Sequence, residues 1–448
     1  MMKKSILILL VLALLLSLSA CGGVKTAAEE PPAAEESLEP AVEEAAPPVH
    51  IVYWNDLPAL DAALQSLAAA YAAQTGTEVE VRTIDRETYA ETLSAAFDAG
   101  DAPTVFCMRG PVDLHAWGGH ALDLSGAAVT AEASNESYRL YGSSGALLGL
   151  GFDEETYGLV VNTELLAKAG YTVEALNGFN SLRALSDGVH IRAGELGFDA
   201  FAPASLMGEE ARELADHLLN IPLFYEFWND GVTATPETVN GSFLPYLRLL
   251  WNLELMDSKV NTAMLIQYDE DVAMQAFFDG KAIFYPQGSW AYERLAEGMD
   301  PDQLCMIPLY CGAPGEENVG LSTGCRDYWA VNAEAPEEER QAALDFLYWM
   351  VSSADNCKTL AQGISSVPFK AAPASTNPFI MEAVARAEQG QTNLTWMFNY
   401  TPEDGLWRDA VLNALARYGM DPVDMYWTEM TATFTEAWRI ACAYAQQR

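Results

Sequence analysis

The residues in this sequence that are best suited to chemistry are aromatic side chains beside polar ones, at places where the chain is expected to turn. Four such groups occur: Tyr53-Trp54-Asn55-Asp56, Phe227-Trp228-Asn229-Asp230, Gly288-Ser289-Trp290 and Arg326-Asp327-Tyr328-Trp329. An indole or phenol ring presents a flat apolar face, and neighbouring amides, carboxylates and guanidinium groups can hydrogen-bond to hydroxyl groups. Recognition of a sugar ring needs that combination.

These groups supply the candidate binding residues. Trp290 is the leading one, because it stands at the C-terminal edge of an expected strand, where ligands bind in open α/β sheets. Core packing explains Trp54, Trp228 and Trp329 equally well, since large aromatic residues are mostly buried. The polar candidates are Ser289, Asn55, Tyr328 (a phenol), Asp230, Asp153, Glu154 and Arg109, which follows an expected strand at 104–108.

The sequence contains no clear catalytic or metal-binding pattern. Its five histidines include no pair at metal-ligand spacing on a helix, and GxSxG, P-loop and zinc motifs are absent. Asp269-Glu270-Asp271 lacks the alternating ligands and glycine of a calcium loop, and is better explained as negative charge at a helix N-terminus. A glycosidase-like carboxylate pair stays open, although acidic pairs are more often solvated surface. We expect no enzyme activity, no cofactor and no metal.

The charge and cysteine content limit the possible partners. The 448 residues carry a formal net charge of −39, which argues against nucleic acid, because nucleic acid binding needs a basic face. It also argues against electrostatic docking on anionic lipid. Half of the residues are hydrophobic, enough for two domains or one large two-lobed unit. Among the cysteines, Cys305, Cys311 and Cys325 could form a bridge, and buried free thiols are equally compatible.

The N-terminal segment is expected to direct export. Lys3 and Lys4 precede an apolar run at 6–16, which is typical of a signal peptide (1–20) and short for a membrane-spanning helix. Leu18-Ser19-Ala20-Cys21 matches the lipobox of bacterial lipoproteins, which implies cleavage before Cys21 and lipidation of its thiol. An ordinary signal peptide or membrane anchor is the alternative. Residues 21–48, rich in Ala, Glu and Pro after the cysteine, are predicted to form a disordered acidic tether.

From residue 49 the chain alternates strands with helices. Strand patterns at 50–54, 78–82 and 104–108 flank helical patterns at 58–74 and 87–99, which are expected to end at Gly76 and Gly100. Such alternation predicts a parallel sheet flanked by helices. Further on, a helix at 269–279 is expected to end at Gly280, a buried strand to occupy 282–285, and Ser289 to be a helix N-cap.

These segments resemble the carbohydrate-binding extracellular solute-binding proteins (family 1) of bacterial ABC importers. FFDGKAIFYPQGSW, residues 277–290, resembles the family signature FxxGKAAMxxxGSW, and weaker elements occur in the expected order at 71–81, 99–105, 158–166 and 324–351. Thr104 and Val161 depart from these elements, replacing the usual aspartate and tyrosine. Trp407 resembles a late tryptophan that lines the cleft in some members.

The resemblance implies a two-lobed α/β fold of the periplasmic-binding-protein type (type II), with a ligand cleft between the lobes. We expect residues 49–155 plus 306–352 in an N-terminal lobe and 156–305 plus 353–448 in a C-terminal lobe, with crossings near Glu155, Met306 and Ser352. A monomeric receptor, lipid-anchored on the extracytoplasmic face of the membrane, would capture a sugar or oligosaccharide and deliver it to ABC permease subunits. A peptide, polyamine or other polar solute is the alternative ligand, and a surface enzyme acting on polysaccharide is an alternative of another class.

Overall fold

The structure is a computed structural model that describes residues 49–142, 144–203, 208–232, 235–256, 267, 270–402 and 405–445. The expected signal peptide, Cys21 and tether therefore lie outside the described residues, as does Asp269. Within the described ranges, no helix combines the length and apolar character needed to cross a membrane. All six cysteines after Cys21 are free thiols, which decides between the two possibilities that the sequence left open.

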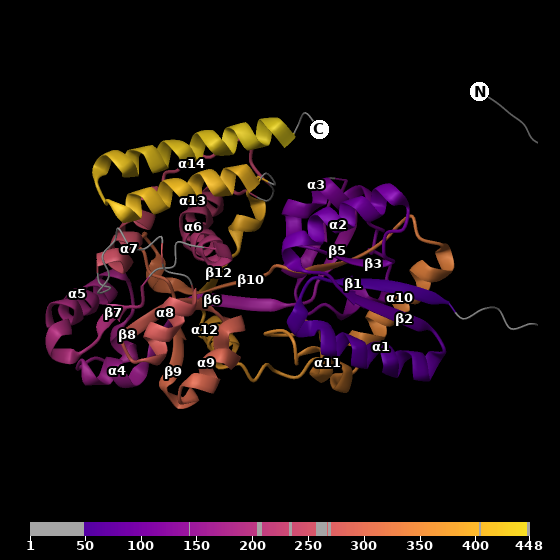
Figure 1. The fold of residues 1–448 in the computed structure, drawn as a ribbon, viewed down its shortest axis with the longest axis horizontal. Helices are drawn as coiled ribbons and strands as arrows, with labels where there is room; N and C mark the ends of the chain where they lie inside the picture. Colours follow the sequence, from indigo (N-terminus) through magenta and orange to yellow (C-terminus); the bar gives the residue numbers. More distant parts are fainter. Residues whose placement is uncertain are drawn as a thin grey trace, which may run out of the picture. The chain divides into compact units, whose positions relative to one another are not determined.

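The strands of the described residues form two sheets (Figure 1). The first has the order β2-β1-β3-β11-β5-β4, with β1 (His50–Asn55), β2 (Glu78–Thr83), β3 (Val105–Met108), β4 (Arg139–Tyr141), β5 (Leu147–Gly151) and β11 (Tyr328–Val331). β1 is parallel to β2 and β3, as the alternation predicted, and β11 runs antiparallel to β3 and β5. The return of the chain as β11 makes this sheet mixed rather than parallel.

The second sheet has the order β12-β10-β6-β8-β7, and β9 also pairs with β6. Its strands are β6 (Glu154–Asn162), β7 (Asp199–Phe201), β8 (Ala282–Gly288), β9 (Leu304–Ile307), β10 (Val319–Cys325) and β12 (Thr392–Thr395). β6 is antiparallel to β8, β9 and β10, and its register places Tyr157 opposite Gly288. This register places Tyr157, near the start of β6, beside the turn that carries Trp290.

Helices surround both sheets. Their bounds are α1 (Asp61–Thr75), α2 (Arg86–Ala99), α3 (Leu114–Trp117), α4 (Thr163–Lys168), α5 (Phe179–Leu196), α6 (Gly208–Asp230), α7 (Leu244–Met256), α8 (Glu270–Phe278), α9 (Tyr292–Gly298), α10 (Glu337–Val351), α11 (Ala354–Leu360), α12 (Pro378–Glu388), α13 (Gly405–Met420) and α14 (Asp424–Ala445). α1 and α2 end at Gly76 and Gly100, whose φ angles of 79° and 74° are left-handed, as predicted. α13 and α14 pack on each other, in yellow in Figure 1.

Each sheet has its own hydrophobic core. The first core takes residues between Ile51 and Phe152 and between Cys325 and Phe369, and we call this part the first lobe. The second lobe has cores built from residues between Tyr157 and Leu321 and between Phe379 and Ala441. The confirmed α/β class therefore takes the form of two separately packed units.

The chain passes between the two sheets at three places in the described residues. The first passage is at 153–155, the second at 326–327 between β10 and β11, and the third within 370–377. The sequence placed the second passage near Met306, but Met306 lies in β9 and pairs with β6 in the second sheet. It placed the third near Ser352, but α11 follows Ser352 and packs against α1 and α10 in the first lobe. A short apolar strand has the same pattern in either sheet, so its pattern does not reveal its lobe.

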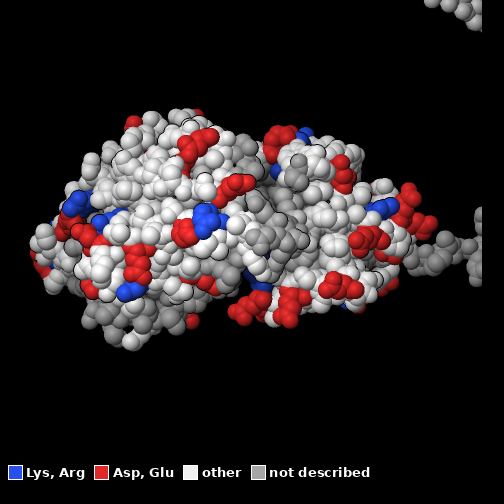
Figure 2. All heavy atoms as spheres, turned by 90° about the horizontal axis from the view of Figure 1, so that it is seen from above, with Lys and Arg blue, Asp and Glu red and all other residues white. Residues whose placement is uncertain are grey.

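The face of the molecule drawn in Figure 2 carries its negative charge in a dispersed form. Figure 2 shows Asp and Glu side chains in small groups over the face that it draws, with few Lys and Arg between them. Like charges spread in this way keep a protein soluble without creating one strongly charged docking patch.

Candidate functional site

Trp290 stands where β8 passes into a short 3-10 turn, Ser289–Ala291, which leads into α9. Its indole is half-buried and lies over Gly288. A Cβ atom at Gly288 would be only 2.1 Å from the nearest indole carbon. Glycine at position 288 therefore allows the indole to occupy this position.

Ser289 ties this turn to two of the passages between the lobes. Its Oγ accepts a hydrogen bond from the Thr156 N–H at 3.1 Å, and its carbonyl accepts one from Asn377 Nδ2 at 2.9 Å. The expectation that Ser289 is a helix N-cap is wrong, because the 3-10 turn moves the start of α9 to Tyr292 and makes Ala291 its cap. Ser289 supports the turn through longer-range bonds instead.

Two further rings pack beside Trp290. The Tyr157 and Trp290 centroids are 6.0 Å apart, and the His217 and Trp290 centroids are 5.6 Å apart. His217, on α6, stacks on Tyr157 with 3.9 Å between centroids and 4° between planes. Burial, with a smaller contribution from the positive charge of Arg326, lowers the pKa of His217 well below its usual range. The imidazole is therefore neutral at physiological pH and acts as an aromatic support.

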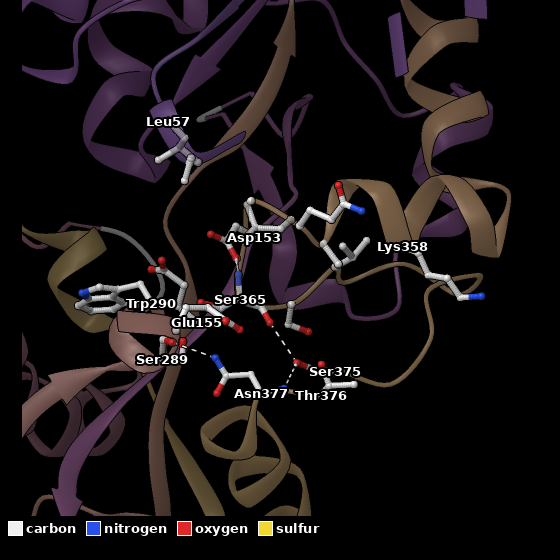
Figure 3. Close-up of a pocket in the computed structure, with 18 of the residues that line it drawn as sticks. Leu57, Asp153, Glu155, Ser289, Trp290, Lys358, Ser365, Ser375, Thr376 and Asn377 are labelled. Atoms are coloured by element: carbon white, nitrogen blue, oxygen red, sulfur yellow. Dashed lines mark hydrogen bonds between the residues drawn. The ribbon is translucent and has the colours of Figure 1, made fainter. Parts of the chain in front are cut away.

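A cleft of about 840 Å³ opens beside Trp290. Both lobes contribute to it: the loop after β1 at 57–59, Arg86 at the start of α2, Asp153 and Glu155 of the first passage, Ser289 and Trp290, and parts of 358–367 and 373–377. In Figure 3, Trp290 and Lys358 lie on opposite sides of the view, with Asp153 between them. The volume is in the range of small-molecule binding sites.

A cluster of charged groups lies beside the cleft in the first lobe. Arg86 Nη2 and Asp327 Oδ1 form an ion pair at 3.1 Å. The adjacent Asp56 is 1% exposed, and within the described ranges neither of its carboxylate oxygens has a hydrogen-bond partner. Burial, followed by the negative charge of Asp327, raises the pKa of Asp56 to about 6, although Arg86 and Arg109 act in the opposite direction. The Asp56 carboxyl is therefore half ionised at about pH 6, instead of near pH 4 as for a solvent-exposed aspartate.

Asp153 is a second buried acid at the cleft. Its Oδ1 accepts a hydrogen bond from the Ser365 N–H at 3.2 Å. Burial, followed by the negative charges of Glu155 and Asp327, raises the pKa of Asp153 well above its usual range. Among the residues that the structure describes, no group of His, Cys, Asp and Glu is arranged to hold a metal ion.

The first-lobe aromatic candidates lie in the core. Trp329 is fully buried, stacks on Phe152 with 4.7 Å between centroids, and donates its indole N–H to Tyr53 Oη at 2.6 Å. Trp54 is 6% exposed and belongs to the same core. The Asn55 amide donates to the Leu57 carbonyl at 2.7 Å. The structure thus places Asn55 at the last position of β1 and both tryptophans in the core of the first lobe, and none of the three lines the cleft.

Three of the polar candidates, Tyr328, Glu154 and Arg109, lie outside the main cleft. Tyr328 and Glu154 line a separate, smaller pocket, and the Tyr328 hydroxyl donates to the Cys325 carbonyl at 3.2 Å. Arg109 pairs with Asp113, with 3.2 Å between Nε and Oδ2. None of these three residues is among those lining the main cleft.

The remaining candidates lie elsewhere in the second lobe. Trp228 is 66% exposed near the end of α6, and Asp230 is exposed at its last residue. Trp407 is 1% exposed in α13, where its indole N–H donates to the Phe434 carbonyl at 3.1 Å and its ring packs edge-on against Trp438. The structure therefore gives Trp407 a place in the core between α13 and α14. Of the predicted set, Trp290, Ser289 and Asp153 line the cleft.

Sequence reasoning missed several residues that the fold brings to the cleft. Arg86 and Glu155 line it, and His217 and Tyr157 pack beside Trp290. Asp153 was a candidate because of its position directly before the expected first crossing, and the same position was a usable signal for Glu155. No signal in the sequence pointed to His217, because α6 and β8 are distant in the sequence and only the tertiary fold brings His217 beside Trp290.

Comparison with known proteins gives a consistent result. A family model described as bacterial extracellular solute-binding protein matches residues 66–387. Comparison with curated proteins gives no match. Among solved structures, a family 1 extracellular solute-binding protein from Bifidobacterium longum subsp. infantis is 15% identical, with a TM-score of 0.66 over 88% of this chain and 99% of that chain.

Two other solved structures contain sugars. RafE of Streptococcus pneumoniae, in complex with raffinose, is 16% identical, with a TM-score of 0.63 over 87% of this chain and 99% of that chain. A sugar transporter protein from Bacillus licheniformis, in complex with stachyose, is 15% identical, with a TM-score of 0.62 over 88% of this chain and 100% of that chain. At this level of identity the similarity establishes the two-lobed fold.

Proposed function

The chain belongs to the bacterial extracellular solute-binding proteins, and we propose that it captures a sugar or oligosaccharide between its lobes and delivers it to the permease of an ABC importer. Trp290 carries the proposal. A half-buried indole, packed against two other rings, lies at the wall of a cleft of about 840 Å³. An aromatic face combined with several convergent polar groups suits a ligand that has both C–H faces and hydroxyl groups.

Three of the residues that line the cleft have a defined role in this proposal. The indole of Trp290 stacks on one sugar ring, while Arg86 and Glu155 bind hydroxyl groups as donor and acceptor. Arg86 belongs to the first lobe and Trp290 to the second, so one ligand contacts both. Binding then favours the closed arrangement to the extent that the ligand binds it better than the open one. The residues capture the ligand and do not change it.

The proposal extends to where the protein acts. Residues 1–20 direct export, and a lipid on Cys21 holds a monomeric receptor to the extracytoplasmic face of the membrane, where 21–48 give it reach. Metabolic labelling with palmitate tests the anchor. Label that persists in Cys21→Ser would show that this cysteine is not the lipidated residue.

A ligand that carries an amine is the second candidate, and the buried acids favour it. Asp56 lacks a hydrogen-bond partner among the described residues, and Asp153 lies directly at the cleft. An ammonium group would compensate such carboxylates better than a hydroxyl group does. A thermal-shift screen that compares spermidine and short basic peptides with raffinose and stachyose separates the two. Stabilisation by the amines and by no sugar would replace the first proposal with the second.

Trp290→Ala tests the proposed site, with Trp228→Ala as its matched control. Loss of the stacking face and its buried area should weaken sugar binding at least about ten-fold, which corresponds to about 1.4 kcal/mol. Trp228 is exposed and outside the cleft, so its removal should leave affinity unchanged. Isothermal titration calorimetry with the sugar that gives the largest thermal shift provides the measurement. Equal affinities for wild type and Trp290→Ala would remove Trp290 from the site.

A further inference from the structure

Asn377 lies where the third passage between the lobes ends and α12 begins. It is the N-cap of that helix, since its Oδ1 accepts a hydrogen bond from the Phe379 N–H at 3.0 Å. Pro378 follows at the first helical position, which its fixed φ angle suits. The Phe379 side chain is fully buried in the second lobe. The start of α12 therefore holds the Asn377 side chain in a defined place.

The other end of the Asn377 amide reaches the turn that carries Trp290. Its Nδ2 donates to the Ser289 carbonyl at 2.9 Å (Figure 3). The same carbonyl accepts the N–H of Tyr292, which closes the 3-10 turn. A peptide bond is planar, so the Ser289 carbonyl lies in one rigid plane with the nitrogen and Cα of Trp290. Asn377 thus holds the plane from which the indole extends.

The indole has little freedom beyond that plane. Once the plane is fixed, only two side-chain torsions place the ring, and each has a few preferred values. Contacts with Gly288, Tyr157 and His217 restrict these torsions further. A displacement of the peptide plane therefore moves the ring relative to the cleft and to the two rings beside it.

Hydrogen bonds also join Asn377 to the passages between the lobes. Its backbone N–H donates to Ser375 Oγ at 3.2 Å, and the Ser375 hydroxyl donates to the Ser365 carbonyl at 3.0 Å (Figure 3). The Ser365 N–H in turn donates to Asp153 in the first passage at 3.2 Å. The position of Asn377, and with it that of Trp290, is therefore set by residues of the first and third passages.

We propose that Asn377 is a positioning residue for ligand binding, whose amide holds the Trp290 ring at the cleft through the Ser289 carbonyl. Asn377 also lines the cleft, so direct contact with the ligand is the competing explanation that the experiments must separate. The effect of Asn377 on affinity rests on the proposed function, whereas its effect on the position of the ring does not.

Two substitutions remove the amide donor and keep the helix cap. Asn377→Asp keeps the length and the capping oxygen but replaces the donating NH2 with an acceptor, and Asn377→Ser keeps a shorter capping oxygen. Asparagine, aspartate and serine are about equally good N-caps, so α12 should stay folded, which thermal unfolding checks. Asn162→Ser is the matched control, because Asn162 caps α4 through the Leu165 N–H and does not line the cleft.

The position of the ring can be followed without any ligand. The sequence has 11 tryptophans, and their indole N–H groups give separate signals in NMR of the ¹⁵N-labelled protein. The Trp290 signal is the one missing from Trp290→Ala. It should shift in both Asn377 variants and stay in place in Asn162→Ser. An unshifted Trp290 signal in both Asn377 variants would overturn the proposal, whether or not a sugar binds.

Calorimetry with raffinose and stachyose tests the effect on affinity. Asn377→Asp and Asn377→Ser should each weaken binding about two- to ten-fold, the range for one lost hydrogen bond. In a Trp290→Ala background Asn377→Asp should cause no further loss, because Asn377 acts through Trp290. A further loss in that background would show that Asn377 acts on the ligand directly and would overturn the positioning role.

The same measurements separate this proposal from the proposed function. Weaker binding by Trp290→Ala with wild-type affinity in both Asn377 variants would refute only the role of Asn377. Equal affinities for wild type and Trp290→Ala would refute the proposed site itself. If neither raffinose nor stachyose binds, the result counts against the proposed function, and the NMR comparison decides whether Asn377 positions the ring.

Discussion

Gly288→Ala should weaken ligand binding although it removes no ligand-binding atom. The backbone of Gly288 is extended, with φ −98° and ψ 171°, so alanine is allowed there without strain. The added Cβ would lie 2.1, 2.2 and 2.3 Å from three carbons of the Trp290 indole. Ordinary contacts between carbon atoms are about 3.5–4.0 Å, so the indole must move by more than about 1 Å. That movement takes it away from its present position beside the cleft.

The magnitude follows from the contacts that the ring would lose. A well-placed aromatic contact contributes about 0.5–1.5 kcal/mol beyond buried area, so the sugar affinity should fall roughly two- to ten-fold. Calorimetry with the preferred sugar measures the affinity, and thermal unfolding checks that the fold is retained. Gly119→Ala is the matched control, because a Cβ at Gly119 would meet no atom within 4 Å. Wild-type affinity in a folded Gly288→Ala protein would show that the position of the Trp290 ring does not determine binding.

Two further substitutions test other parts of the structure. His217→Leu should weaken sugar binding about two- to ten-fold, while His217→Phe should retain it, because of the two replacements only the phenyl ring can stack on Tyr157 beside Trp290. Calorimetry that gives equal sugar affinities for the two variants would show that His217 only fills the core. Glu254 is 2% exposed without a hydrogen-bond partner for either carboxylate oxygen in the described residues, and burial raises its pKa from 4.5 to about 8. The folded state therefore holds a proton that the unfolded state loses, so stability declines as pH rises from about 4.5 to about 8. Glu254→Gln should raise the free energy of unfolding at pH 8 by about 2–4 kcal/mol and have little effect at pH 4.5; a pH-independent difference in denaturant unfolding would contradict this.

Local sequence rules predicted well where several helices end. Gly76, Gly100 and Gly280 all have positive φ angles, as expected where helices end. These positions follow from backbone sterics, which act within a few residues. The passages near Met306 and Ser352 were misplaced because the packing partners of a strand or a short helix depend on distant residues. Leu304–Ile307 pairs with β6, about 150 residues earlier, and no local pattern encodes that choice.

The site was only partly predictable for the same reason. Trp290 and Ser289 are adjacent in one motif, so their placement at the end of a strand could be inferred from the sequence. Trp329 and Trp407 stand beside polar residues too, yet both are buried in cores. An aromatic residue at a turn has the same local pattern whether its ring faces a cleft or a core. Burial alone separates the two cases, and burial is a property of the tertiary fold.

The hydrogen bonds of Ser289 connect ligand contact with the arrangement of the lobes. Ser289 precedes Trp290, and it bonds to Thr156 at the end of the first passage and to Asn377 at the end of the third. Asp153, in the first passage, accepts a hydrogen bond from Ser365, whose carbonyl accepts one from Ser375 Oγ. If the lobes close around a ligand as proposed, a shift of the turn that carries Trp290 would reach the first and third passages directly through these hydrogen bonds, because each bond is short and directional.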